Sequence, residues 1–244
     1  MTDTPSAGEG GRELATTDEP SRRSIGEMLT VLRDRPSVLV GLVVALLGYS
    51  IVSDILEPLL ASSEAGFLLA VVPLWIATFV LVGFVLWVER RPLASIGVAW
   101  PRWSDLWLGI GGTVAGLLTL LVTIPLMIAL GFEQSQGPVQ QVPQWAVLLI
   151  VLTSIVEEVL FRGYPIERLA EITGSVWAAA TVTFVVFVLL HAPAWGVGHL
   201  ITISGISIVF MVMYVRYRRL GPVMIMHFMS NFVLLVIVPR LGSF

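Results

Sequence analysis

The sequence predicts an all-α protein, a bundle of about seven transmembrane helices. Three observations support this class: 56% of the 244 residues are hydrophobic, only 13% are charged, and the apolar residues gather in seven long segments. A soluble domain carries about 25% charged residues, so this chain has too few to cover a surface that faces water. At about 20 residues per span plus loops, residues 37–244 hold six to eight helices.

The first 36 residues differ from the rest in carrying 12 charged side chains. Residues 1–23 lack an apolar run, and we expect a disordered cytoplasmic tail there. Ser24-Ile-Gly-Glu27 has the spacing of a capping box, and apolar residues follow it at helical intervals. The pattern is typical of a short helix on the membrane surface; an ordinary linker is the alternative.

Seven apolar segments make up the predicted membrane domain, residues 37–244. They run over residues 37–52, 67–88, 106–130, 145–161, 175–190, 200–215 and 220–238. Arginine occurs in every second connection, namely the N-terminal tail, loop 89–105, the connection after residue 161, and the loop before residue 220. The positive-inside rule then places the N-terminus in the cytoplasm and the C-terminus outside. Only Arg240 lies on the wrong side.

Several kinds of chemistry are excluded by composition. The chain has no cysteine, which excludes disulfides, thiolate metal sites and cysteine nucleophiles. It has no lysine, which excludes Schiff bases. The net charge of −3 gives no support for nucleic-acid binding, so we expect none.

Two adjacent carboxylates stand out in the fourth segment, because ionisable groups inside a span are costly and suggest function. Glu158 and Arg162 are four residues apart and can pair on one helix face. Glu157 points about 100° away and is left for chemistry. The alternative is that both glutamates lie at the cytoplasmic interface.

Three further polar residues lie in later apolar segments. His191 ends the fifth segment, while His227 and Asn231 share one helix face in the seventh. A single buried histidine is usually a hydrogen-bonded core group. Together with Glu157, however, these residues supply a base, a proton carrier and hydrogen-bond donors, which amide hydrolysis needs.

These residues resemble three motifs of the CPBP family, the CAAX proteases and bacteriocin-processing enzymes, which includes the type II CAAX prenyl endopeptidase. The resemblance rests on Glu157-Glu158-x-x-x-Arg162, Phe187-x-x-x-His191 and His227-x-x-x-Asn231, and the motif-bearing core covers residues 145–235. It implies a membrane-embedded endopeptidase.

The resemblance also implies roles for the individual residues. Glu157 and His191 would activate a water molecule, and His227 and Asn231 would stabilise the oxyanion. A second group, consisting of Glu158, Arg162 and Phe187, would support the site. We expect no cofactor, although zinc held by Glu157, His191 and His227 is the mechanistic alternative.

The implied partners are the lipid bilayer and a peptide or protein substrate, which could be prenylated or membrane-anchored. Two other functions stay open: a non-catalytic immunity or scaffold protein of the same family, and a proton-coupled transporter.

One feature of the predicted segments conflicts with this site. If the fourth helix ends near Phe161, Glu157 lies about 6–10 Å from the cytoplasmic end of its span, at 1.5 Å per residue. His191 lies about 24 Å from the cytoplasmic end of its own span. The two residues meet only if the fifth helix begins deeper or is tilted, or if the fourth helix begins later than Trp145.

Overall fold

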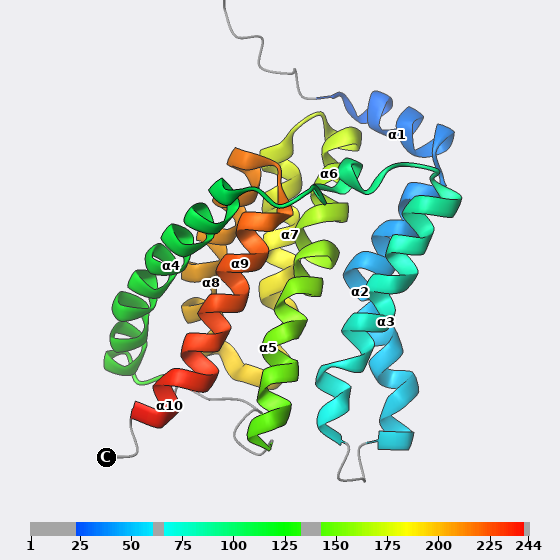
Figure 1. The fold of residues 1–244 in the computed structure, drawn as a ribbon. Coiled ribbons are helices and arrows are strands. Elements are labelled where there is room, and N and C mark those ends of the chain that lie inside the picture. Colours follow the sequence, from blue (N-terminus) through cyan, green and yellow to red (C-terminus); the bar gives the residue numbers. More distant parts are fainter. Residues whose placement is uncertain (1–22, 61–65, 133–142, 242–244) are drawn as a thin grey trace, which may run out of the picture.

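The computed structural model describes residues 23–60, 66–132 and 143–241, which form helices joined by turns and contain no strand (Figure 1). The all-α class is therefore confirmed for this part of the chain. The predicted disordered tail is residues 1–23, of which residues 1–22 lie outside the described residues.

Each of the seven apolar segments corresponds to a helix. In chain order these are α2 (Ser37–Leu60), α3 (Val72–Gly83), α4 (Trp103–Ala129), α5 (Gln144–Glu158), α7 (Val176–Leu190), α8 (Ala192–Tyr217) and α9 (Leu220–Phe232). A π-helical turn, Phe84–Val88, extends α3, and another, Val233–Ile237, joins α9 to α10 (Val238–Leu241).

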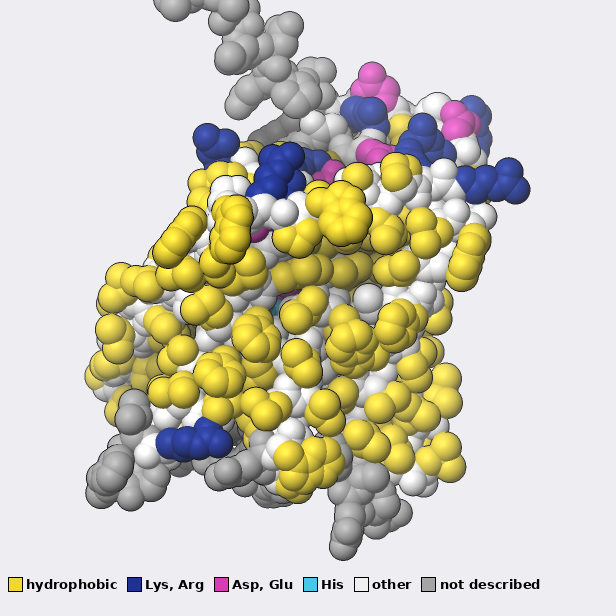
Figure 2. Space-filling model, viewed as in Figure 1, with side chains coloured by type: hydrophobic (Ala, Val, Ile, Leu, Met, Phe, Trp, Pro, Cys, Tyr) yellow, Lys and Arg dark blue, Asp and Glu magenta, His cyan; other side chains and the backbone are white. Residues whose placement is uncertain are grey.

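Membrane-spanning length is reached by five stretches of the described residues. They are Ser37–Leu60, Leu68–Val88, Trp103–Ala129, Gly198–Tyr217 and Leu220–Arg240, and Val176–Leu190 is a shorter apolar helix. Length and composition thus indicate a multi-pass membrane protein. Figure 2 shows the matching surface, with apolar side chains over the body of the bundle and arginine and acidic side chains gathered at the end that carries α1.

Helix α1 (Ile25–Asp34) confirms the predicted capping box. The Ser24 hydroxyl accepts from the backbone N–H of Glu27, and the Glu27 carboxylate accepts from the backbone N–H of Ser24 at 2.7 Å. That second hydrogen bond lowers the pKa of Glu27. The helix lies across one end of the bundle, against α6 (Tyr164–Thr173) (Figure 1).

Helix α6 is the main difference from the sequence prediction, which treated the residues after 161 as a connection. The chain instead continues from α5 through a π-helical turn, Val159–Gly163, directly into α6. Gly174 then ends α6 in the left-handed conformation at φ 74°, and Ser175 caps the start of α7. The two helices therefore form a tight antiparallel hairpin.

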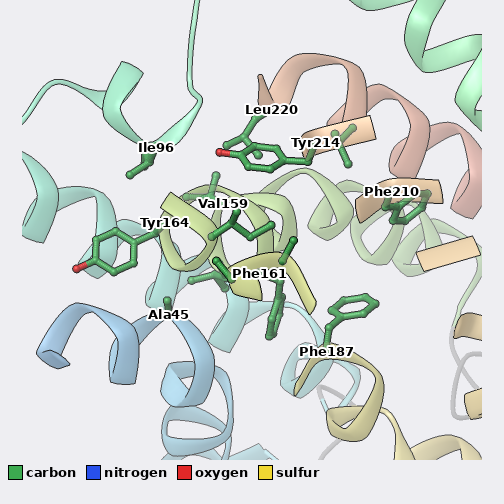
Figure 3. Packing of buried hydrophobic residues seen from close by; sticks show 14 of the residues in the cluster. Ala45, Ile96, Val159, Phe161, Tyr164, Phe187, Phe210, Tyr214 and Leu220 are labelled. Carbon is green, nitrogen blue, oxygen red and sulfur yellow. The ribbon is translucent and has the colours of Figure 1, made fainter. Parts of the chain in front are cut away.

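The continuous α5–α6 unit lies at the centre of the bundle. It packs against α7 and α9 and, on another side, against the α2–α3 pair (Figure 1). Its side chains Val159, Phe161 and Tyr164 meet Phe187, Phe210 and Leu220 from the surrounding helices in the buried cluster of Figure 3.

Helix α4 packs closely on α8 and α9 along a stripe of glycines. A Cβ atom at Gly109 would meet Ile225, and one at Gly116 would meet Ile206. Small residues of this kind let apolar helices approach each other inside a membrane. At the charged end, Asp105 of α4 is almost fully buried and pairs with Arg219 at 2.7 Å.

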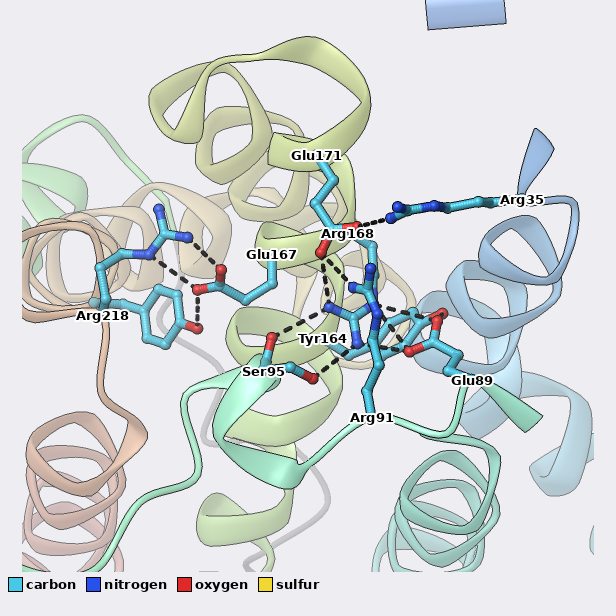
Figure 4. A network of polar contacts seen from close by, with 10 residues as sticks. Arg35, Glu89, Arg91, Ser95, Tyr164, Glu167, Arg168, Glu171 and Arg218 are labelled. Carbon is cyan, nitrogen blue, oxygen red and sulfur yellow. Dashed lines mark hydrogen bonds and ion pairs between the residues drawn. The ribbon is translucent and has the colours of Figure 1, made fainter. Parts of the chain in front are cut away.

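A polar network on α6 ties the charged end together (Figure 4). The guanidinium of Arg168 is fully buried and binds both carboxylate oxygens of Glu89, while Tyr164 donates to the same carboxylate at 2.7 Å. Burial and the neighbouring Glu89 raise the pKa of Tyr164, so its hydroxyl stays protonated and donates. The network fixes α6 against the loop that follows α3.

We predict that Gly41→Ala destabilises the protein. A Cβ at Gly41 would overlap the phenol ring of Tyr164 and displace its hydrogen bond to Glu89. Overpacking of this kind costs about 1–3 kcal/mol, which thermal unfolding in detergent micelles would register as a lower midpoint.

The matched control is Gly111→Ala, because a Cβ at Gly111 of α4 would meet nothing within 4 Å. We expect its midpoint to equal or exceed that of the parent protein. Equal midpoints for the two alanine variants would contradict the packing of Tyr164 against α2.

Candidate active site

The centre of the site is the carboxylate of Glu158, which binds two partners from different parts of the chain. Its Oε1 atom lies 2.9 Å from Nη1 of Arg162 and 2.6 Å from Nδ1 of His227. All three residues are buried, with Glu158 0% exposed. The predicted pair of Glu158 and Arg162 is thus confirmed.

His227 was expected to act with Asn231, and the structure adds Glu158 as its partner. Since a carboxylate paired with a guanidinium accepts hydrogen bonds, Nδ1 of His227 is the donor in this contact. The other ring nitrogen, Nε2, is then left for a substrate. Within the described residues the half-buried Asn231 amide makes no hydrogen bond, so its N–H groups stay available.

Two phenylalanines hold the guanidinium of Arg162. Its Cζ atom lies 4.0 Å from the ring centre of Phe187 and 5.3 Å from that of Phe210. Such contacts contribute about 2 kcal/mol or more where water is excluded. Each ring also touches one of the site histidines: Phe187 lies 4.6 Å from His191 and Phe210 lies 4.8 Å from His227, between ring centres.

Phe210 is a residue that sequence reasoning missed. It lies on α8, and one aromatic residue within an apolar segment carries no pattern that marks it out. Only the packing of α8 beside α7 and α9 brings it to the site.

His191 is held by its own helix. Its Nδ1 lies 2.8 Å from the carbonyl oxygen of Phe187, and because a carbonyl only accepts, Nδ1 is the donor. In a neutral imidazole, Nε2 then carries the lone pair. A histidine with this tautomer can accept a proton through Nε2.

Glu157 makes neither of the two hydrogen bonds that Glu158 makes to Arg162 and His227. It is half-buried, and the hydroxyl of Thr153 donates to it at 3.4 Å. Glu157 interacts electrostatically with His227 and Arg162, and His191 interacts with the same two groups. Among the described residues Glu157 and His191 do not bind each other directly.

The depth conflict is resolved by the continuation of α5 into α6. Glu157 precedes the end of α6 at Thr173 by 16 residues, and His191 follows the start of α7 at Val176 by 15 residues. At 1.5 Å per residue these are about 24 Å and about 22 Å. Because α6 and α7 form an antiparallel hairpin, the two residues lie at similar depth.

The zinc alternative requires Glu157, His191 and His227 to converge on one ion. Across the described ranges no three His, Cys, Asp or Glu side chains form a group that could hold a metal ion. Nδ1 of His227 is bound to Glu158 and Nδ1 of His191 to a carbonyl, which leaves Nε2 of both rings, as in histidines that hold a metal. The donor set is therefore not assembled as a metal group within the described residues, and zinc stays the mechanistic alternative.

Comparison with protein families matches residues 139–233 to the model described as Type II CAAX prenyl endopeptidase Rce1-like. This part of the chain is an Rce1-like family domain. The match covers α5 to α9 and contains Glu157, Phe187, His191, His227 and Asn231. Phe210 lies inside it too, whereas α1 to α4 lie outside. No curated protein and no solved structure matches the chain.

We predict that Arg162→Met destabilises the Rce1-like domain far more than the double variant Glu158→Gln, Arg162→Met. Removing Arg162 alone leaves the buried Glu158 carboxylate without its cation, which costs about 3–5 kcal/mol. Removing both charges avoids that penalty. Thermal unfolding of the four proteins of the cycle measures the coupling, and strictly additive effects would contradict a direct ion pair.

Proposed function

We propose that the protein is a membrane-embedded endopeptidase that hydrolyses a peptide bond with activated water. The observation that carries this proposal is the meeting of three motifs from separate helices. Glu158 of α5 binds His227 of α9, and Arg162 packs on Phe187 of α7, the residue that holds His191. The family match supports it, because the model that fits this region describes an endopeptidase.

In this proposal Glu157 and His191 activate the water. The lone pair on Nε2 of His191 and the carboxylate of Glu157 share the proton removed from water as its oxygen attacks the scissile carbonyl carbon. The same proton then passes to the amine that leaves when the C–N bond breaks. One water is consumed, and one carboxyl and one amino terminus are formed.

The oxyanion of the tetrahedral intermediate would be stabilised by His227 and Asn231. The contact of Nδ1 with Glu158 fixes the orientation of the His227 ring, and in this role Nε2 donates an N–H to the developing charge. The amide N–H group of Asn231, one turn along α9, adds a second donor. Donors of this kind contribute about 10²–10³ in kcat.

The substrate that fits this site is a peptide segment able to reach a buried polar cluster. A prenylated or membrane-anchored protein meets this requirement, because its anchor holds the cleavable segment at the bilayer. The arginine distribution supports a cytoplasmic N-terminus and an external C-terminus, and in this proposal the α1–α6 end of the bundle faces the cytoplasm.

We predict that Glu157→Gln abolishes peptide cleavage while the protein keeps its thermal stability. The glutamine keeps the size of the side chain and loses its basicity. The measurement is mass spectrometry of peptides cleaved from membrane extracts, comparing parent and variant. The matched control is Glu57→Gln, the same change on the exposed far part of α2, and it should cleave like the parent. Retained cleavage in the Glu157 variant would contradict the proposal.

We further predict that cleavage survives removal of divalent metals. In the proposed mechanism Glu157 and His191 activate the water without a metal ion, so dialysis against a chelator should leave the cleavage rate within about twofold. Elemental analysis of the same sample gives an independent readout. Loss of activity that zinc restores would favour the metal-dependent mechanism.

A further inference from the structure

A shallow cationic groove lies away from the candidate active site, at the charged end of the bundle. It has a volume of about 300 Å³ and is lined by Arg35, Ser37, Val38, Val88, Glu89 and Arg91. Arg35 lies between α1 and α2, Ser37 and Val38 begin α2, Val88 ends the π-helical extension of α3, and Glu89 and Arg91 follow it. No part of the groove lies in the region matched by the family model.

The charges around the groove do not cancel. Arg35, Arg91 and Arg168 share two carboxylates, Glu89 and Glu171 (Figure 4). One positive charge of this cluster is therefore uncompensated. The Arg168 side chain is fully buried, whereas those of Arg35 and Arg91 are 54% and 29% exposed, so the accessible charge lies on the groove.

The groove also lies at the boundary between polar and apolar surface. The candidate span Ser37–Leu60 begins at it and the candidate span Leu68–Val88 ends at it. Just beyond the arginines the surface is apolar, with Trp87 78% exposed and Val88 57% exposed. A ligand here would meet guanidinium groups at one end and exposed apolar side chains at the other.

We propose that this groove binds an anionic glycerophospholipid of the surrounding bilayer. Its phosphate would lie against Arg35 and Arg91, which are donors suited to phosphate oxygens, and an acyl chain would run along Trp87 and Val88. Basic pockets between spans on the cytoplasmic side bind lipid headgroups in this way. The apolar flank favours a lipid over free phosphate, because free phosphate gains nothing from it.

Native mass spectrometry of the full chain in detergent tests the proposal. The protein is titrated with phosphatidylglycerol, with phosphatidylcholine of the same acyl chains, and with inorganic phosphate. We expect phosphatidylglycerol to bind at least about fivefold more tightly than phosphatidylcholine, the effect of about one arginine at a membrane surface. Arg35→Gln should remove about fivefold of that affinity, and the double variant Arg35→Gln, Arg91→Gln should abolish the preference.

Arg33→Gln is the matched control, because Arg33 is 79% exposed on α1 and does not line the groove. It should keep the full preference. If the double variant fails to fold, the half-exposed Arg35 variant alone decides the result.

Three results would overturn the proposal. They are equal binding of the two lipids, an equal loss in the Arg33 and Arg35 variants, and displacement of the lipid by inorganic phosphate at similar concentration. None of these readouts involves cleavage, so the lipid site and the proposed peptidase activity are tested independently of each other.

Discussion

The buried carboxylate of Glu158 is the constraint on which the rest of the site depends. A charge inside an apolar bundle is tolerated only when it is paired and hydrogen-bonded, and Oε1 of Glu158 meets this condition with Arg162 on its own helix and His227 on α9. The pair in turn requires a place for the guanidinium, which Phe187 and Phe210 provide on either side. One electrostatic requirement thus joins α5, α7, α8 and α9 around a single point.

The helical hairpin of α6 and α7 sets the depth of this point. Because α5 continues through a π-helical turn into α6, Glu157 and His191 are equally far from the turn at Gly174. The polar network around Arg168 fixes α6 at the charged end of the bundle. The contacts of Glu158 and Arg162 fix the end of α5, so polar contacts hold the continuous α5–α6 unit at two places.

Much of this could be predicted from the sequence, where the signal was local. Each of the seven apolar segments corresponds to a helix, and the spacing of Glu158 and Arg162 predicted their pairing. Helix α6 was not predicted because its charged residues, such as Glu167 and Arg168, are typical of a loop. Their interaction partners lie on distant segments and cannot be recognised from the local sequence. Phe210 and the contact between Glu158 and His227 were not predicted for the same reason, because both depend on packing between helices that are far apart in the chain.

The chain has three histidines, which makes ¹⁵N NMR of histidine-labelled protein the most direct test of the central claim that Glu158 holds Nδ1 of His227. Substitution of each histidine in turn assigns the signals. The account predicts that Nδ1 of His227 carries a hydrogen-bonded proton and that Glu158→Gln shifts its resonance, while the signals of His199 stay unchanged. A His227 ring with an unprotonated Nδ1, or one that does not respond to Glu158→Gln, would contradict it.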